Sequence, residues 1–146
     1  MNIDSIQNGI VIDHIAAGRG MRLYQLLGLG ELDCQVAIIK NAASRKMGRK
    51  DIIKIDANIP VNLDVIGYVD PGATINIIRS GELVEKRVIG MPERLVNVIR
   101  CKNPRCITSQ EQELDHVFVL TDRTHDVYRC LYCETKASDA QPEIRK

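Results

Sequence analysis

Residues 74–89 read TINIIRSGELVEKRVI and carry the clearest structural signal in the chain. Two runs with Ile, Leu and Val at strand-like spacing, 74–79 and 82–89, flank the dipeptide Ser80-Gly81. Ser-Gly can adopt the primed two-residue turn whose twist matches a β-hairpin. The stretch therefore predicts two antiparallel strands joined by a tight turn.

The segments before this hairpin alternate between strand and helix patterns. Runs rich in Ile and Val predict three further strands, at residues 9–14, 34–39 and 51–56, with a loop at 43–48. Helical patterns occur at residues 18–29 and 60–68, and Pro60 suits the first position of the second helix. This order predicts an α+β fold, with one mostly antiparallel sheet and both helices on a single face, as in a ferredoxin-like sandwich.

The sequence changes character after Met91. Residues 92–146 contain four of the five cysteines and only short apolar runs, at 117–120 and 127–129. A segment of about fifty residues with so little apolar sequence folds poorly without an additional staple. We therefore expect two domains, 1–91 and 92–146, of which the second is small and all-β.

The overall composition is that of a globular protein. Among 146 residues, 45% are hydrophobic and 27% are charged, and the net charge is +1. This balance excludes a disordered tail and a polycation, so bulk affinity for nucleic acid or anionic membrane is not expected. No run approaches the roughly 20 apolar residues of a membrane span, and the start of the chain lacks a leader pattern, so we expect a cytoplasmic protein.

Four cysteines fall in two close pairs. Four residues separate Cys101 from Cys106, two separate Cys130 from Cys133, and 23 lie between the pairs. Two such knuckles can converge on a tetrahedral four-thiolate site, with a short strand ahead of each pair on a two-stranded scaffold. Because four thiolates leave no open position, the pattern predicts one structural Zn²⁺ per chain in a zinc-ribbon-like domain. Cys34 lies apart, in an expected apolar strand.

The cysteine spacing fits a zinc site better than it fits free thiols, disulfides or iron. Chance rarely places four cysteines at ligand spacing, and disulfides are disfavoured in a reducing compartment. A four-thiolate iron site has similar spacing and stays open, although zinc is commoner in closed, redox-quiet sites. Zinc ribbons also bind nucleic acid, but residues 93–146 contain nine Lys or Arg and nine Asp or Glu, so their balanced charge favours contact with protein.

A basic cluster precedes the third expected strand. Arg45, Lys46, Arg49 and Lys50 lie within six positions, and Lys54 follows on the same strand face as Lys50. The two lysines could bind one anion, although a run of this kind is more often a solvated loop. The cluster alone does not separate these two possibilities.

Asp13, His14 and Lys86 could join this basic cluster only if the strand order brings them together. His14 is by type more often a strand-end residue with a backbone partner, and Asp13 could bind a sugar hydroxyl or begin a turn. The sequence contains no nucleophile paired with a base, no phosphate-cradling glycine loop and no carboxylate pair. The sequence therefore offers no set of residues for a known enzyme mechanism.

Three segments and the cysteine framework occur together in one known family. The segments are GIVIDHI at 9–15, MGRKDIIKI at 47–55 and PER at 92–94, followed by the paired cysteines. With these features in the same order from about Ile6 to Glu134, the chain resembles the regulatory chain of aspartate carbamoyltransferase. The metal framework and the strand motifs are independent features, so the likeness is specific.

The resemblance implies a non-catalytic, allosteric subunit in pyrimidine biosynthesis. In that family the N-terminal domain binds nucleotide effectors, and the zinc domain docks on the catalytic chain, so that regulatory homodimers bridge catalytic trimers. It implies that nucleoside triphosphates are bound by Asp13, nearest the ribose, and by residues near the phosphates, namely His14, Lys50, Lys54 and Lys86. Such regulation requires effectors that bind two quaternary states with different affinity.

The chain departs from the family pattern in its last hairpin. Some members carry an aromatic residue there against the effector, and Gly81 takes its place in this sequence. A contact with the nucleotide is lost, which leaves nucleotide preference open. The alternative function is a zinc-ribbon nucleic-acid-binding module, which salt-sensitive retention on DNA or RNA would distinguish from co-purification with a catalytic chain.

Overall fold

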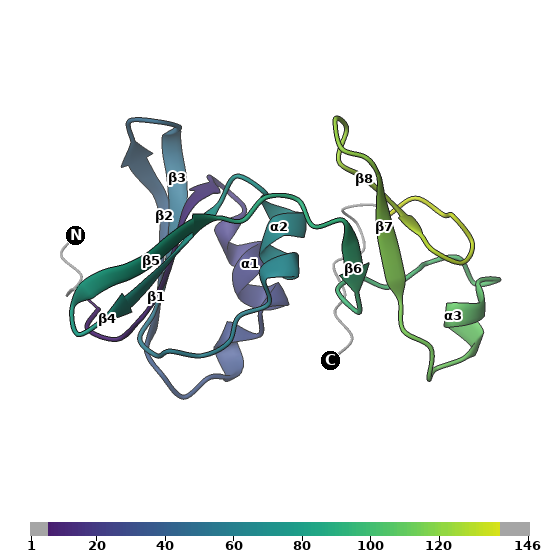
Figure 1. Cartoon of the computed structure of the whole chain (residues 1–146), viewed down its shortest axis with the longest axis horizontal. Coiled ribbons are helices and arrows are strands. Elements are labelled where there is room, and N and C mark those ends of the chain that lie inside the picture. Colours follow the sequence, from purple (N-terminus) through teal and green to yellow (C-terminus); the bar gives the residue numbers. More distant parts are fainter. Residues whose placement is uncertain (1–5, 138–146) are drawn as a thin grey trace. The chain divides into compact units, whose positions relative to one another are not determined.

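The computed structural model describes residues 6–137 of the chain. Its internal contacts divide the chain into two compact units, Met1–Gly90 and Met91–Lys146, and each unit has its own sheet (Figure 1). Within the described part, no helix is long and apolar enough to cross a membrane.

The N-terminal unit is a five-stranded antiparallel sheet covered by two short helices. Its strands are β1 (Gly9–Ala16), β2 (Val36–Ser44), β3 (Gly48–Ile55), β4 (Thr74–Arg79) and β5 (Glu82–Val88). The order β2-β3-β1-β4-β5 is the ferredoxin-like arrangement with β5 added at one edge. On one face lie the helices α1 (Gly20–Leu26) and α2 (Leu63–Val69), with a 3₁₀ turn, η1 (Leu29–Glu31), after α1 (Figure 1). The predicted α+β sandwich is confirmed.

Strand alternation gives this sheet one apolar face. Six isoleucines, each at most 3% exposed, form the sheet side of the core: Ile10, Ile12, Ile15, Ile53, Ile55 and Ile75. Five large apolar helix residues are buried as well: Leu23, Leu26, Val65, Ile66 and Val69. Burying a side chain of this size contributes about 1.5–3 kcal/mol, so this layer is the main source of stability in the unit.

A bulge in β1 shifts side chains without breaking the register of the sheet. Asp13 and His14 together oppose one residue of β3, and His14 has a φ of 57°. The extra residue lets Ile12 and Ile15, three positions apart, both point into the core at 0% exposure. The bulge thereby fixes the orientation of Asp13 and His14.

Buried Asp51 fastens the segments around the start of β3. Its Oδ1 accepts the backbone N–H of Asn41 at 2.8 Å, and its Oδ2 accepts those of Gly18 at 3.1 Å and Gly20 at 2.9 Å. Position 20 requires glycine, because a Cβ there would lie 2.8 Å from Asp51 Oδ2. The Asp51 carboxylate therefore connects β3 to the start of α1 and to a second bulge, at Asn41 (φ 59°) in β2. Asp51 is the residue after Lys50, so these bonds also hold the backbone next to Lys50 in place.

The β4–β5 hairpin turns where the sequence predicts. Ser80 has a φ of 51° and Gly81 a φ of 77°, as a primed two-residue turn requires. The Ser80 N–H donates to Asn8 Oδ1 at 3.1 Å, and the Gly81 N–H donates to the Gln7 carbonyl at 2.8 Å. Gly81 therefore serves the turn itself.

Some predicted boundaries in this unit were wrong. The second strand begins at Val36, so Cys34 lies outside it, and it continues to Ser44, so that the loop expected at 43–48 is only 45–47. The second helix begins after Asn62, whose Oδ1 accepts the backbone N–H groups of the first helical turn, and Pro60 lies before it. A capping side chain closer to the apolar run determines the helix start.

The C-terminal unit is a small three-stranded antiparallel sheet with one helical turn. Its elements are β6 (Arg94–Val96), α3 (Ile107–Gln110), β7 (Val117–Asp122) and β8 (Val127–Cys130), and the strand order is β6-β7-β8. Its core is formed by Leu95, Val98, Ile99, Phe118 and Tyr128. The prediction missed β6 and α3, because three or four residues are too few to show a periodic pattern.

Candidate metal centre and effector surface

Four cysteine sulfurs meet in the C-terminal unit. The Sγ atoms of Cys101, Cys106, Cys130 and Cys133 all lie within 4.8 Å of one another. Cys101 Sγ is 3.5 Å from Cys133 Sγ, and Cys106 Sγ is 3.7 Å from Cys130 Sγ. A disulfide holds its sulfurs about 2.05 Å apart, whereas thiolates about 2.3 Å from a tetrahedral zinc ion are about 3.8 Å apart. The cluster therefore has the size of a four-thiolate metal site and not of two disulfides.

Two loops deliver these sulfurs. Cys130 ends β8, and Cys133 lies in the turn that follows. Cys106 is the N-cap residue of α3, and Cys101 lies in the loop between β6 and α3. A short strand lies ahead of each pair, as expected, although residues 97–100 separate β6 from Cys101. The expected two-stranded scaffold was wrong, because the sheet of this unit has three strands.

Hydrogen-bond donors surround the sulfurs. Backbone N–H groups donate to three of them, from Asn103 to Cys101, from Tyr132 and Cys133 to Cys130, and from Thr135 to Cys133. The Thr108 hydroxyl is 3.1 Å from Cys106 Sγ, and the Thr135 hydroxyl is 3.1 Å from Cys133 Sγ. Such donors stabilise the thiolate form that a metal binds.

The thiols of this cluster ionise to different extents. Burial raises the pKa of Cys101 and of Cys130. Burial acts in the same direction on Cys133, but hydrogen bonds with the hydroxyl and N–H of Thr135, the Asn103 side chain and the Cys101 thiol together outweigh it and lower the pKa of Cys133 to about 6. Four thiolates this close require a cation, and zinc deprotonates its thiol ligands on binding. Cys34 is not part of the cluster, so four sulfurs form a complete ligand set for one structural Zn²⁺.

A row of paired residues crosses the sheet face that α1 and α2 leave uncovered. Lys54 of β3 pairs with Val11 of β1, Val11 with Asn76 of β4, and Asn76 with Lys86 of β5. The neighbours of this row on β1 and β3, and Ile75 on β4, are buried isoleucines, so alternation places the row on the opposite face. The strand order thus brings Lys54 and Lys86 to one face of the sheet.

Asp13, His14 and Lys50 lie at or next to the bulge of β1. Lys50 Nζ is 3.0 Å from Asp13 Oδ1, and His14 Nδ1 is 3.0 Å from Thr74 Oγ1. Burial raises the pKa of Asp13, but the His14 N–H and the Lys50 ammonium outweigh it and hold that pKa below its ordinary value. Asp13 is therefore an ionised acceptor at neutral pH.

The row also contains groups without partners. Neither Lys54 nor Lys86 forms an ion pair with any residue from 6 to 137. The Oδ1 atom of Asn76 is buried and, among the same residues, has no hydrogen-bond donor. Sequence analysis missed Asn76, although a polar residue at the centre of an isoleucine-rich strand was a usable signal.

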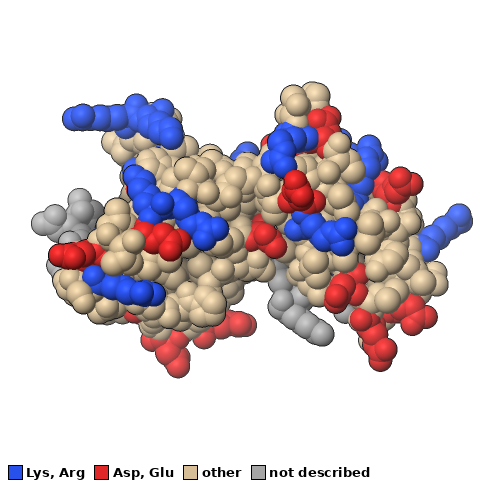
Figure 2. Space-filling view, in the orientation of Figure 1, with Lys and Arg blue, Asp and Glu red and all other residues tan. Residues whose placement is uncertain are grey.

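The other basic residues of the third-strand segment lie elsewhere. Arg45 and Lys46 are in the turn of the β2–β3 hairpin, and Arg49 donates to the Asn41 carbonyl at 3.4 Å. Lys and Arg side chains gather at the outer end of this hairpin, at the upper left of Figure 2. They are separate from the row through Lys54 and Lys86.

Comparison with known proteins identifies the family. Residues 1–90 match the family model for the aspartate carbamoyltransferase regulatory chain, allosteric domain. Residues 93–142 match the model for the metal binding domain of the same chain. The chain belongs to this family.

Proteins named aspartate carbamoyltransferase regulatory chain are similar over nearly the full length. The one from Clostridium botulinum is 48% identical over 134 residues, 92% of each chain. The one from Clostridium acetobutylicum is 45% identical over 134 residues, again 92% of each. The one from Bifidobacterium longum is 42% identical over 137 residues, 94% of this chain and 99% of the relative.

Membership in the regulatory-chain family accounts for both units. It makes this chain a non-catalytic subunit, and it implies the pyrimidine pathway. The four clustered cysteines fall within the segment that matches the metal binding domain, which fits one structural zinc. The nucleic-acid-binding alternative is not favoured.

Proposed function

We propose that residues 1–91 of this regulatory chain bind a nucleoside triphosphate effector on the uncovered sheet face, and that residues 92–146 dock on the aspartate carbamoyltransferase catalytic chain. The observation that carries the effector proposal is the row from Lys54 to Lys86, with Asp13, His14 and Lys50 beside it. Binding of the nucleotide to this chain would then change the activity of the catalytic chain.

The chemistry of the row suits a nucleotide. Lys54 and Lys86 are cations that no acidic side chain of the described residues neutralises, so each can bind a phosphate oxygen. Ionised Asp13 can accept a ribose hydroxyl, and Lys50, already 3.0 Å from Asp13, can bridge between sugar and phosphate.

The effector proposal is tested by one pair of variants on the same strand. Lys86 lies on the uncovered face, whereas Arg87 pairs with buried Ile75 and points to the other face. Lys86→Ala should weaken nucleoside triphosphate binding by about tenfold, since a hydrogen bond to a charged group is typically worth about 1.5–3 kcal/mol. Arg87→Ala should leave it unchanged, and binding of the nucleoside should be insensitive to both.

Calorimetric titration with a triphosphate and the matching nucleoside, at low and high salt, measures these differences. The loss at Lys86 should shrink as salt rises, because salt screens charge interactions. Equal losses in the Lys86 and Arg87 variants would remove the uncovered face from the proposal. No binding at millimolar nucleotide would leave the N-terminal unit as a scaffold.

Docking on the catalytic chain is supported by apolar side chains next to the metal ligands. Ile107 is 49% exposed, Leu131 45% and Tyr132 46%. Each is adjacent in sequence to a cysteine of the cluster, so the metal would hold all three in place. Tyr132→Ser should weaken co-purification with a catalytic chain and keep the zinc. Val96→Ser, at an exposed site on β6, should leave both co-purification and zinc content unchanged.

Strand β2, at one edge of the N-terminal sheet, is suited to contact with a second regulatory chain. Residues 36–39 of β2 are apolar on both faces of this edge strand, whereas the opposite edge, β5, carries four charged residues that discourage strand pairing. We therefore place the homodimer contact along β2. Ile39→Lys should shift the sedimentation coefficient toward the monomer, and Leu83→Lys on β5 should not.

The compartment is part of the same proposal. A partner of a biosynthetic enzyme, with free cysteines that need a reducing environment to stay available for metal, fits the cytoplasm. Fractionation of cells with an antibody to the chain tests it.

A further inference from the structure

The metal centre has a buried neighbour that is not one of its four ligands. We propose that His116 is a positioning residue of this centre, which holds the backbone of Cys101 through its imidazole ring and thereby sets the first metal knuckle. The inference concerns the metal site and does not depend on effector binding.

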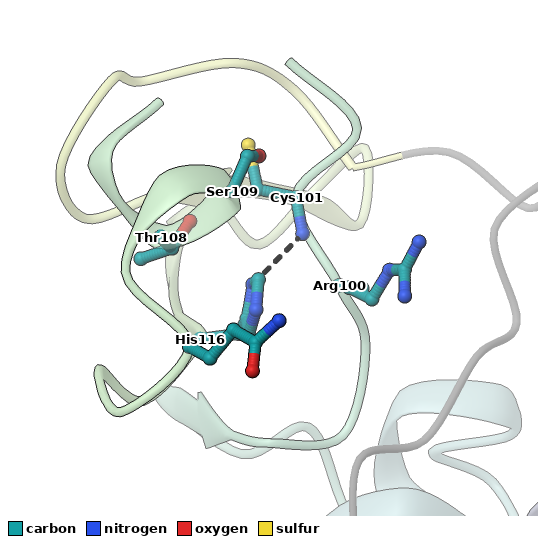
Figure 3. Close-up of a pocket in the computed structure, with 6 residues that line it drawn as sticks. Arg100, Cys101, Thr108, Ser109 and His116 are labelled. Carbon is teal, nitrogen blue, oxygen red and sulfur yellow. Dashed lines mark hydrogen bonds between the residues drawn. The ribbon is translucent and has the colours of Figure 1, made fainter. Parts of the chain in front are cut away.

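His116 lies directly against the first cysteine. It precedes β7, is 2% exposed, and its Nδ1 accepts the backbone N–H of Cys101 at 3.2 Å. Figure 3 shows the ring aimed at this N–H, with Thr108 and Ser109 of α3 on the other side of the same cavity. The contact joins two segments 15 residues apart, so it defines the loop that carries Cys101.

The backbone of His116 is held by Asn97. The His116 N–H donates to Asn97 Oδ1 at 3.0 Å, and the Asn97 N–H donates to the His116 carbonyl at 2.8 Å. The Asn97 side chain also donates from Nδ2 to Asp115 Oδ1 at 2.9 Å. The main chain at His116 is therefore fixed before its ring reaches Cys101.

The hydrogen bond assigns the tautomer. A backbone N–H can only donate, so Nδ1 of His116 must present its lone pair, and the ring proton is on Nε2. A buried N–H group almost always has an acceptor, and within the described chain His116 Nδ1 is the one that Cys101 has.

The position of the Cys101 sulfur depends on this bond. The Cys101 N–H is held by His116, and the Cys101 Sγ accepts the N–H of Asn103, so the residue is fixed on both sides. Outer-shell partners of this kind orient metal ligands, and their loss typically lowers metal affinity about 10–100-fold. Without His116 the first knuckle would have to find its ligand geometry while binding the metal.

The site has room for a test by substitution. The ring borders a cavity of about 320 Å³ lined by Arg100, Cys101, Thr108, Ser109, Gln112 and His116. Asparagine places its Oδ1 as many bonds from Cβ as the Nδ1 of histidine, so it can accept the same N–H. Glutamine places its oxygen one bond further away, and leucine fills space without any acceptor.

The experiment compares His116→Asn, His116→Gln and His116→Leu in the full chain. Zn²⁺ affinity is measured by competition with a chelating indicator, and Co²⁺ substitution reports whether four thiolates still bind. We expect His116→Asn to stay within about threefold of the parent chain and the other two to lose about 10–100-fold, with four thiolates in all. If histidine only filled space, leucine would do better than asparagine, and equal or reversed affinities would overturn the proposal.

A second measurement needs no variant and decides the matter if the variants do not fold. Long-range ¹H–¹⁵N correlation on the zinc-loaded parent chain distinguishes the protonated from the unprotonated ring nitrogen of His116. The proposal requires an unprotonated Nδ1 and slow exchange of the Cys101 amide. A proton on Nδ1, or a rapidly exchanging Cys101 amide, would exclude the bond.

Discussion

The two units of this chain stabilise themselves by different means. The N-terminal unit packs isoleucines from three strands against two helices, and this layer is complete without any ligand. The C-terminal unit has three short strands, of which the first contains three residues, and four cysteines within 4.8 Å of one another. An apolar core can stabilise the first, whereas the second needs a metal to join loops that its core does not hold.

The same difference separates the surfaces of the two units. A sheet with helices on one face leaves the other face free of helices, and there the N-terminal unit displays Lys54 and Lys86. The metal-supported loops instead display apolar side chains beside the cysteines. The lysine cations on the stable sheet are suited to bind a small polyanion, and the apolar groups on the loops are suited to contact a protein partner.

The largest expected effect is that of metal removal. Chelation should abolish amide protection in the C-terminal unit and leave it in β1, β3 and β4, because binding of structural zinc supplies about 10–16 kcal/mol of folding free energy in zinc-finger peptides. Hydrogen exchange with and without chelator measures this. Equal loss of protection in both units would mean that the two are not independent.

Cysteine substitutions test which thiols bind the metal. Cys130→Ser should abolish stoichiometric zinc binding, because it removes one ligand from a set of four. Cys34→Ser should keep one zinc per chain, because Cys34 lies outside the cluster. Metal analysis of the purified variants decides, and zinc loss from the Cys34 variant would refute the ligand assignment.

A substitution in the isoleucine core should destabilise the N-terminal unit only. Ile12 is fully buried in the sheet core, so Ile12→Ala should destabilise the N-terminal unit by about 2–5 kcal/mol. Zinc content and protection of the C-terminal amides should not change. Urea unfolding followed by exchange at single residues measures both, and a matching loss in the C-terminal unit would contradict the division.

The smallest effect concerns the Lys50–Asp13 pair. The pKa of Asp13 is lowered in the folded chain, so its contribution to stability is present above the pKa of a free aspartate, about 4, and disappears as pH falls through the lower folded value. The contribution should be at most about 1 kcal/mol, because the pair is partly exposed. Lys50→Ala should raise the Asp13 pKa in an NMR titration, and an unchanged pKa would show that Lys50 does not contribute.

The sequence predicted those features that local chemistry determines. The turn at Ser80 and Gly81 and the cysteine pairs follow from residue types at fixed spacing, and both are found. The bulges at His14 and Asn41 were not predictable, because they arise where strand register and the Asp51 carboxylate compete with simple alternation. Predicting which lysines share a face required the strand order, which no local pattern contains.

The contribution of His116 could not be predicted for a related reason. Its ring accepts an N–H from a loop 15 residues earlier, and the spacing of the two residues carries no motif. Asn97, with a φ of 58°, holds the main chain of His116 through contacts that only the folded sheet brings together. Ligand spacing thus predicts a metal site, while its supporting residues depend on tertiary structure.

One titration tests the division of functions between the two units. A nucleoside triphosphate is titrated calorimetrically into the zinc-loaded chain and into the same chain after metal removal, and each sample is then mixed with a cognate catalytic trimer. We predict equal nucleotide affinity in both states and assembly only with zinc, because the effector face belongs to the unit that folds without metal. Loss of nucleotide binding on metal removal, or assembly without zinc, would contradict the assignment of the two functions to two independent units.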